Sequence, residues 1–255
     1  MRPARSRYRG AVAETLVVNE IYLSLQGEST FAGLPCIFVR LTGCNLRCSY
    51  CDTAYAFTAG NRRPLAEVLA EVQRLAEPLK RSTAAGPLPL VELTGGEPLL
   101  QPNATVLMRA LADLGFTVLV ETSGALDING VDSRVRRIMD LKCPSSGEAD
   151  RNRWENLGHL RATDELKFVI GTVADYEWAV EVVRTHRLDT VCPILFSWVA
   201  PLLEAQRDLS LKPVPAGQTA LTRRELVERI VADHLPVRFQ LQQHKFIWPP
   251  DERGV

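Results

Sequence analysis

The chain has 255 residues, of which 46% are hydrophobic and 24% are charged, and 30 basic residues balance 30 acidic ones. This composition is typical of an ordinary globular protein and argues against a fibrous or disordered one. Without an overall positive field to attract a nucleic-acid backbone or an anionic membrane, the chain is expected to bind a small molecule, with no nucleic acid and no membrane as partner.

The two ends of the chain are expected to lie outside the folded core. The first ten residues, MRPARSRYRG, are basic, and no apolar signal core follows them. No stretch approaches the roughly 20 apolar residues of a membrane span. We therefore predict a cytoplasmic protein with a single domain over residues 1–255, a solvated arm over residues 1–16 and a peripheral tail over residues 249–255.

Apolar runs that are typical of strands alternate along the chain with segments of helical periodicity. Strands are predicted at residues 17–25, 36–43, 90–96, 116–124, 137–144, 165–171 and 190–198. Helices are predicted at residues 64–78 and 103–115, with shorter candidates near residues 154–160 and 174–185. The first of these helices places its apolar side chains on one face: Leu65, Val68, Leu69, Val72 and Leu75.

A last helix is predicted to begin at Thr222, because Glu225 three residues later completes a capping box. This helix is expected to run through Leu226, Ile230 and Val231. The repeated order of strand then helix predicts an α/β fold with parallel strands and right-handed crossovers. About six such units fit the length, which is too few for a closed eight-fold barrel, so we expect an open, partial barrel with an extra N-terminal strand segment.

The ends of the predicted strands carry the segments of chemical interest. Three cysteines follow the strand at residues 36–43, and the turn TGGEP at residues 94–98 ends the next strand. The segments ETSG, at residues 121–124, and LKCPSSG, at residues 141–147, end two more. Because parallel α/β folds gather their chemistry at the carboxyl ends of the strands, these four loops are expected to face one cavity.

Half of the cysteines are clustered. Cys44, Cys48 and Cys51 lie within eight residues, whereas the other three are isolated among apolar or proline neighbours and are expected to be buried structural thiols: Cys36, Cys143 and Cys192. Cytosolic thiols are kept reduced, so the cluster indicates a metal or catalysis and not a disulfide.

Several metal or redox sites could use such a cluster. A structural zinc site needs a fourth ligand, and none stands near by, although a distant cysteine or histidine could supply one. A redox CxxC motif would leave Cys44 without a role. Iron–sulfur clusters are held by thiolates at short spacings of this kind, and three thiolates on a four-iron cluster leave one iron open for chemistry.

Two motifs resemble those of the radical S-adenosylmethionine (SAM) superfamily. The first is Cys44-x3-Cys48-x2-Cys51 with aromatic Tyr50 before the last cysteine, and the second is the glycine-rich turn at residues 94–98. The segments SLQGEST, CDT, ETSG, KCPSSG and LQQHKFIW together resemble the 7-carboxy-7-deazaguanine synthase family of that superfamily. This resemblance runs from about Val18 to Trp248.

The resemblance implies a reaction and its cofactors. The family converts 6-carboxy-5,6,7,8-tetrahydropterin to 7-carboxy-7-deazaguanine, a precursor for queuosine-type tRNA modification, by hydrogen abstraction at C6, radical ring contraction and loss of ammonia. It uses a 4Fe-4S cluster, SAM and Mg²⁺. The resemblance also implies an external reductant, such as flavodoxin, and a homodimeric assembly.

Site residues follow from the same resemblance. Cys44, Cys48 and Cys51 would bind the cluster, and Thr53 would bind Mg²⁺, although without the resemblance Thr53 would more often be a helix cap or turn residue. The expected SAM contacts are Tyr50, Asp52, Gly96, Cys143, Pro144 and Ser145. The expected substrate contacts are Leu25, Gln26, Gly27, Arg40, Thr94, Glu121 and His244.

Residue chemistry supports two of these substrate contacts. Alternation along the strand places Phe38 and Arg40 on one face, near the carboxyl end where the cavity is expected, and a guanidinium matches a carboxylate through two hydrogen bonds. The Glu121 carboxylate suits the donors of an aminopyrimidine edge, unless it is a strand-end acid facing water. The roles of Glu97 and Lys245 stay open.

Two other functions remain alternatives at this stage. Another radical SAM enzyme, such as a glycyl-radical activase, would share the cysteine triplet and the partial barrel but would not account for SLQGE, CDT and HKFIW together. A non-enzymatic module with a closed zinc or electron-transfer cluster would need a fourth local ligand and would make TGGEP accidental.

Overall fold

The computed structural model describes residues 14–79, 88–249 and 252–255. Within these ranges the chain forms one nine-stranded sheet in the order β3-β1-β2-β4-β5-β6-β7-β8-β9. The strands are β1 (Thr15–Leu25), β2 (Pro35–Leu41), β3 (Asn61–Pro64), β4 (Leu90–Gly95), β5 (Thr117–Thr122), β6 (Arg136–Asp140), β7 (Glu165–Ile170), β8 (Ile194–Trp198) and β9 (Arg238–Gln240). The α-helices are α1 (Leu65–Ala76), α2 (Asn103–Asp113), α3 (Val173–His186), α4 (Arg223–Ala232) and α5 (His244–Ile247).

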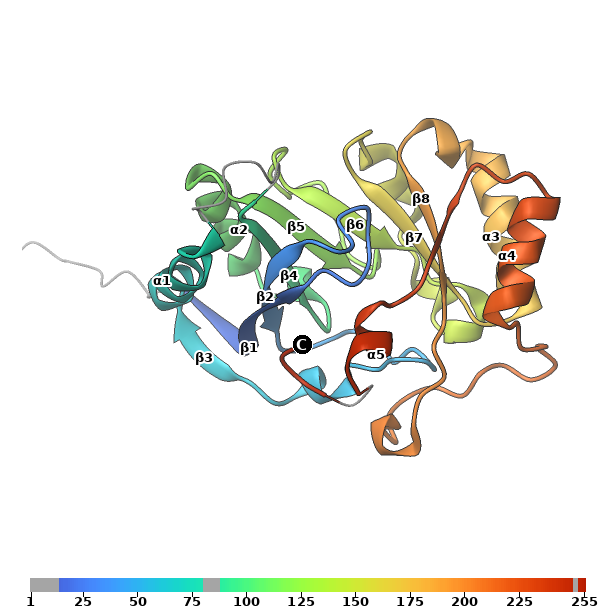
Figure 1. Ribbon diagram of the computed structural model, residues 1–255, viewed down its shortest axis with the longest axis horizontal. Coiled ribbons are helices and arrows are strands. Elements are labelled where there is room, and N and C mark those ends of the chain that lie inside the picture. The colour runs from blue at the N-terminus through green and yellow to red at the C-terminus, as the bar shows by residue number, and fades with distance from the viewer. Residues whose placement is uncertain (1–13, 80–87, 250–251) are drawn as a thin grey trace, which may run out of the picture.

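The sheet is a parallel series with an antiparallel extension at one end. Strands β2 and β4 to β9 pair in parallel, whereas β1 pairs antiparallel with β2, and β3 pairs antiparallel with β1. Since β3 and β9 are its two edges, the sheet does not close, and the prediction of an open partial barrel with an added N-terminal strand is confirmed. In Figure 1 the strands run from α1 at one end of the molecule to α3 and α4 at the other, with α5 between the two ends.

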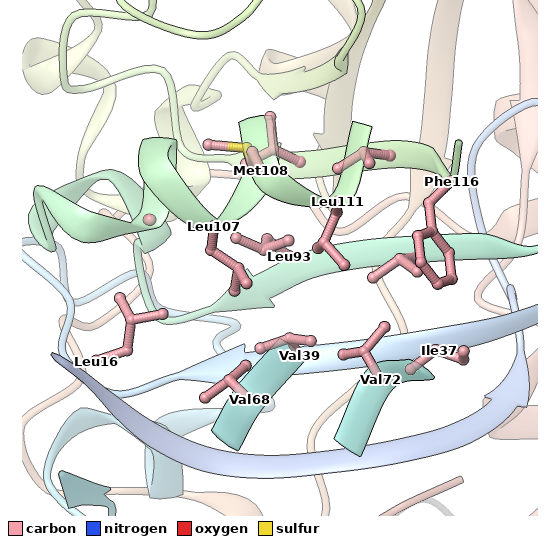
Figure 2. Close-up of a cluster of buried hydrophobic side chains, with 14 of the residues drawn as sticks. Leu16, Ile37, Val39, Val68, Val72, Leu93, Leu107, Met108, Leu111 and Phe116 are labelled. Atoms are coloured by element: carbon pink, nitrogen blue, oxygen red, sulfur yellow. The ribbon is translucent and has the colours of Figure 1, made fainter. Parts of the chain in front are cut away.

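Helices cover one face of the sheet and so leave the other face for the site. Figure 2 shows Val68 and Val72 of α1 packed on the side of β2 that carries Ile37 and Val39. Leu107, Met108 and Leu111 of α2 join the same cluster, and a second cluster joins β6 to β8 with α3 and α4. Because successive strand residues point to opposite faces, the residues between these apolar ones face inward.

Most predicted elements are present. The Thr222–Glu225 capping box begins α4, which runs through Leu226, Ile230 and Val231 as predicted; Leu226 and Ile230 are buried, and Val231 is 66% exposed. The segment near 154–160 is a 3₁₀-helix, Trp154–His159. The short strands β3 and β9 were not predicted, because their sequences, NRRP and RFQ, lack an apolar alternation.

The two ends of the chain differ from the prediction. Strand β1 begins at Thr15 and Leu16 is fully buried, so the predicted arm over residues 1–16 extends too far into the core. Residues 1–13 of that arm lie outside the described ranges. At the other end, Pro249 and residues 252–255 line the main cavity and are therefore not peripheral. No helix in the described ranges is long and apolar enough to cross a membrane.

Candidate active site

A cavity of about 630 Å³ opens at the carboxyl ends of the parallel strands. This size is in the usual range for small-molecule sites. The cavity collects most of the predicted site residues: Leu25, Gln26, Gly27, Arg40, Cys44, Cys48, Tyr50, Cys51, Asp52, Thr53, Thr94, Gly96, Glu121 and His244. The predicted contacts Cys143, Pro144 and Ser145 do not line it.

The three clustered cysteines are free thiols in the cavity wall, whereas Cys36, Cys143 and Cys192 are buried as expected. The backbone N–H of Leu46 donates to the Cys44 sulfur at 3.4 Å. Burial raises the pKa of Cys48 to about 11 and that of Cys51 to about 12. Thiols in such surroundings stay protonated unless a bound metal stabilises the thiolate, so these residues suit a metal centre better than a free nucleophile.

A site for a single metal ion is not formed. In the described part of the chain, no group of three or more His, Cys, Asp or Glu side chains is arranged to hold one ion. A four-iron cluster is wider than one ion, and its thiolates do not converge on one point. The number and short spacing of these cysteines suit an iron–sulfur cluster.

The glycine-rich turn lies directly against the cysteine loop. A Cβ atom on Gly96 would come within 2.2 Å of the Gly43 carbonyl oxygen and 2.7 Å of the Cys44 Cβ. Gly95 has a φ of +142°, which side chains rarely adopt. The backbone N–H of Glu97 donates to the Gly43 carbonyl at 2.8 Å. Both glycines are thus required for this close approach, and both line the cavity beside the cysteines.

Glu97, whose role the sequence left open, ties two strand-end loops together. Its side chain is fully buried. Its oxygens accept hydrogen bonds from the Thr122 hydroxyl at 3.0 Å and from the backbone N–H and hydroxyl of Ser123 at 2.7 and 2.6 Å. Glu97 does not line the cavity, so its role is to hold the loop after β4 against the end of β5.

Arg40 lies in the cavity wall, where the alternation along β2 placed it. Its Nε donates to Glu20 Oε1 at 2.6 Å and its Nη2 to the Tyr22 hydroxyl at 2.8 Å. The Tyr55 hydroxyl donates to the same Glu20 oxygen. Glu20 was missed, although β1 pairs it directly with Arg40, so the antiparallel register was the signal that could have found it.

The helix α5 closes one side of the cavity with an ion pair. Lys245 Nζ lies 2.5 Å from Asp52 Oδ2, and the lysine side chain is only 9% exposed, so Lys245 is not a surface charge. Burial alone would raise the pKa of Asp52, but Lys245 outweighs it and holds this pKa well below its usual range. His244 approaches Gly27, whose missing side chain leaves room for the imidazole.

Thr53 stands at the N-cap position of the 3₁₀-helix Ala54–Phe57, yet its side chain makes no capping bond. Its hydroxyl instead donates to Asp52 Oδ1 at 2.8 Å. The capping explanation therefore does not account for its side chain, and the lone pairs of the hydroxyl oxygen are left for another partner.

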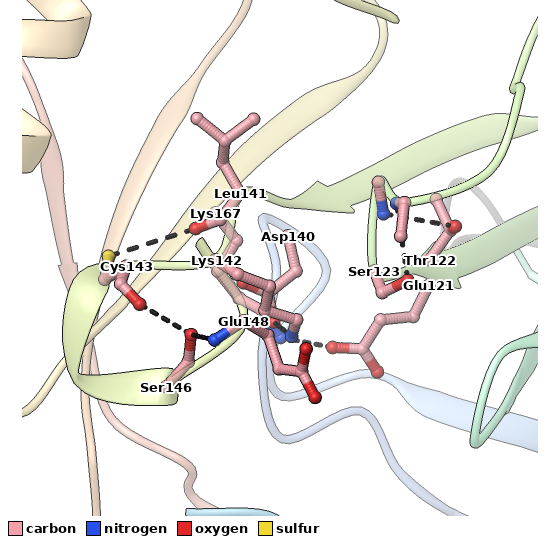
Figure 3. A network of polar contacts seen from close by, with 12 residues as sticks. Glu121, Thr122, Ser123, Asp140, Leu141, Lys142, Cys143, Ser146, Glu148 and Lys167 are labelled. Atoms are coloured by element: carbon pink, nitrogen blue, oxygen red, sulfur yellow. Dashed lines mark hydrogen bonds and ion pairs between the residues drawn. The ribbon is translucent and has the colours of Figure 1, made fainter. Parts of the chain in front are cut away.

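Two buried lysines, neither of them predicted from the sequence, bring charge into the cavity. Lys142 Nζ lies 2.7 Å from Asp140 Oδ2, and Lys167 Nζ pairs with Glu28 at 3.0 Å and with Glu121. Figure 3 shows the contact of Lys167 with Glu121. A charged residue inside an otherwise apolar strand such as ELKFVI was the available signal, since such a side chain needs a partner.

Several buried polar atoms near the end of β6 have no hydrogen-bond partner in the described ranges. They include the Tyr50 hydroxyl, Asp140 Oδ1 and Ser145 Oγ. Tyr50 and Asp140 line the cavity, and burial, followed by the charge of Asp140, raises the pKa of the Tyr50 phenol well above its usual value. Unpartnered buried atoms are rare in folded proteins, and here they indicate room for a polar ligand.

Comparisons with known proteins agree with this site. Residues 38–187 match the model of the radical SAM superfamily. The chain is 45% identical to a 7-carboxy-7-deazaguanine synthase from Koribacter versatilis, over 93% of this chain and 99% of the relative. It is 41% identical to one from Chlorobaculum tepidum, over 94% of this chain and 97% of the relative.

Solved structures share the fold. The crystal structure of QueE from Escherichia coli has a TM-score of 0.64 at 22% identity and covers 90% of this chain and 95% of its own. Streptococcus suis SuiB bound to S-adenosylmethionine has a TM-score of 0.55 at 15% identity and covers 78% of this chain and 48% of its own.

Proposed function

Because the chain belongs to the 7-carboxy-7-deazaguanine synthase family of the radical SAM superfamily, we propose that it converts 6-carboxy-5,6,7,8-tetrahydropterin to 7-carboxy-7-deazaguanine with loss of ammonia. The observation that carries the proposal is the meeting of three free thiols, the glycine-rich turn and a charged polar floor in one cavity. A glycyl-radical activase would act on a partner protein and has no need of this enclosed polar floor.

Cys44, Cys48 and Cys51 would hold the 4Fe-4S cluster. The donor set fits, since all three thiols line the cavity and a bound metal would offset the burial that keeps them protonated. Together, the cluster and SAM supply a carbon radical able to take hydrogen from an unactivated carbon. The Leu46 N–H beside the Cys44 sulfur would stabilise negative charge there.

SAM would lie between the cysteine loop and the end of β6. The exposed backbone beside Gly96 suits the polar end of an amino acid, because no side chain stands in the way. Tyr50 and Asp140 offer unpartnered polar atoms in the same cavity. Asp52 would contribute from the cysteine loop, whereas Cys143, Pro144 and Ser145, which do not line the cavity, would support its wall from the segment after β6.

The pterin would occupy the part of the cavity enclosed by the loop after β1, by β4 and β5, and by α5. Arg40 would bind its carboxylate, because Nε and Nη2 are held by Glu20 and Tyr22 and fix the orientation of the guanidinium. No described residue accepts from Nη1, which leaves the end of the fork for the substrate. Leu25, Gln26, Gly27, Thr94, Glu121 and His244 would complete this part of the site.

Magnesium, the reductant and the oligomer are further parts of the proposal. The Thr53 hydroxyl would bind Mg²⁺ beside the substrate carboxylate, as suits an ion that keeps several waters and takes few protein ligands. Reduction of the cluster needs an electron from outside the chain, for which a flavodoxin is suited. A homodimer stays a prediction that light scattering can check.

Product analysis tests the function. The anaerobically reconstituted protein, mixed with SAM, a reductant and the carboxytetrahydropterin, should form 7-carboxy-7-deazaguanine and ammonia, measured by mass spectrometry and an ammonia assay. The Cys48→Ser variant should form neither, whereas the Cys192→Ser variant should form both. A protein that binds a cluster and cleaves SAM but leaves the pterin unchanged would point to a different radical SAM reaction.

A further inference from the structure

Five polar residues form a cluster on the floor of the cavity, here called the carboxylate cluster: Gln26, Glu28, Glu92, Glu121 and Lys167. Gln26, Glu92 and Lys167 are each only 3% exposed. Lys167 Nζ binds Glu28 Oε2 at 3.0 Å and also binds Glu121 Oε1, while Gln26 Nε2 donates to Glu92 Oε2. The Glu28 backbone N–H donates to Gln26 Oε1 at 2.8 Å and joins the two sets of bonds, so the cluster is a connected network that draws on the loop after β1 and on three strands.

The carboxylate cluster has three carboxyl groups but only one ammonium. The surroundings therefore shift the pKa values of these carboxyl groups in different directions. Burial, followed by the charge of Glu121, raises the pKa of Glu92 well above its ordinary value. Burial alone would raise the pKa of Glu28 as well, but Lys167 and His244 outweigh it and lower this pKa. Glu92 is hydrogen-bonded to the neutral amide of Gln26, whereas the Lys167 ammonium pairs with Glu28 and Glu121, so Glu92 is the carboxyl of the cluster best placed to hold a proton; because its Oε2 accepts from Gln26, that proton belongs on Oε1.

Glu92 and Glu121 lie on the inner face of neighbouring strands. In the parallel pairing of β4 with β5, Glu92 is opposite Leu119. Two residues further along each strand, the Thr94 hydroxyl donates to Glu121 Oε2 at 3.2 Å, which shows that these side chains share one face. Both glutamates line the cavity, and the Glu121 side chain, at 30% exposed, is more open than that of Glu28 or Lys167.

We propose that Glu92 is a specificity-determining hydrogen-bond donor that, with Glu121 as acceptor, recognises the 2-amino-4-oxo edge of the pterin, and that Lys167 positions Glu121. This inference rests on the proposed function, since it takes a pterin as substrate. The edge presents a carbonyl acceptor followed by ring N–H and amino donors, so it needs one donor and one acceptor from the protein. A 2,4-diamino analogue replaces the carbonyl by an amino donor and would set a donor against a donor at Glu92.

Binding of stable analogues to the cluster- and SAM-loaded protein tests the proposal. Pterin-6-carboxylate is fluorescent, and 2,4-diaminopteridine-6-carboxylate can be titrated as its competitor. The wild-type protein should prefer the oxo compound by roughly tenfold or more, as expected for a hydrogen bond replaced by a clash of donors. In Glu92→Leu the two dissociation constants should become similar.

The Glu92→Gln variant distinguishes two roles of Glu92, that of a protonated hydrogen-bond donor and that of a charged acceptor. Its carboxamide can still accept from Gln26 and donate to the carbonyl, so the preference for the oxo compound should be retained. Glu165→Gln is the matched control, because Glu165 is another buried carboxyl with a raised pKa, caused mainly by burial, but it hydrogen-bonds Thr30 outside the cavity. That variant should keep the wild-type preference.

Loss of the preference in a folded Glu92→Gln protein would overturn the proposal, and this comparison stands even if Glu92→Leu fails to fold. Retention of the preference in folded Glu92→Leu would overturn it equally, while the function would survive if the wild-type protein still turns over the carboxytetrahydropterin. A wild-type protein that neither binds pterin-6-carboxylate nor turns over the tetrahydropterin would overturn the proposed function itself.

Discussion

The two sides of the cavity differ in how completely their polar groups are satisfied. On the side of the cysteine loop, three thiols stay protonated through burial, and the Tyr50 hydroxyl and Asp140 Oδ1 have no partner among the described residues. On the floor, Lys167, Glu28 and Glu121 pair with one another. The cofactor side thus depends on groups that the chain does not supply, whereas the floor is already organised for its ligand.

The cysteines should show the largest effect, because the cofactor side has no substitute for them. Cys44→Ser, Cys48→Ser or Cys51→Ser should each lose most of the iron and abolish product formation, since a serine hydroxyl is a poor ligand for iron–sulfur clusters. Iron analysis and the visible absorption spectrum measure the loss. Cys36→Ser, Cys143→Ser and Cys192→Ser are the controls, and a cluster lost in Cys192→Ser but kept in Cys48→Ser would reverse the assignment.

Replacement of Lys167 on the floor should have the next largest effect, on the stability of the protein as well as on ligand binding. Lys167→Met leaves Glu28 and Glu121 facing each other without their cation, and breaking a buried ion pair lowers the free energy of unfolding by about 3 kcal/mol. Lys212→Met is the matched control: its partner is Glu148, and its side chain is 44% exposed, so the cost should stay below about 1 kcal/mol. Denaturant unfolding measures both, and equal losses would contradict an organised floor.

The sequence predicts the two sides of the cavity unequally, because one side is formed by residues that are close together in the chain and the other by residues that are far apart. The spacing of the cysteines and the glycines of the turn lie close together in the chain, so a local pattern was enough to find them. Lys167 meets Glu28 across 139 positions, and Lys245 meets Asp52 from the far end of the chain. No local pattern states which distant carboxylate a lysine will reach; only the presence of a charge in an apolar strand could indicate that a partner exists.

The same reasoning applies to the fold. The central strands were predicted because their burial requires continuous apolar runs. The edge strands β3 and β9 carry exposed polar residues and are strands because β1 and β8 offer them free backbone groups, which is a property of the sheet and not of their own sequence.

Arg40 also lines the cavity. Its replacement should have an effect between those expected for Lys167 and for Thr53. Arg40→Lys keeps the charge but loses the planar fork, which bonds Glu20 through Nε and Tyr22 through Nη2. The KM for the carboxytetrahydropterin should rise roughly tenfold, which corresponds to about 1.4 kcal/mol. Steady-state kinetics measures this rise.

Cluster content and SAM affinity should stay near wild type in Arg40→Lys. Arg134→Lys is the control, since Arg134 pairs with Asp132 and Asp113 on the surface. An unchanged KM in a well-folded Arg40→Lys protein would return Arg40 to a purely structural role beside Glu20.

Thr53 should give the smallest effect, because Mg²⁺ keeps most of its waters and can replace one lost protein ligand by another water. The neighbouring Asp52 is engaged by Lys245 and by the Thr53 hydroxyl, so the Thr53 oxygen is the more available ligand on this loop. In Thr53→Ala the magnesium concentration for half-maximal rate should rise roughly threefold, with an intact cluster spectrum. Thr58→Ala, at the other end of the same 3₁₀-helix and exposed, should titrate like the wild type. If Thr53→Ala and Thr58→Ala respond alike to magnesium, Thr53 is not a magnesium ligand and its hydroxyl serves only to orient Asp52.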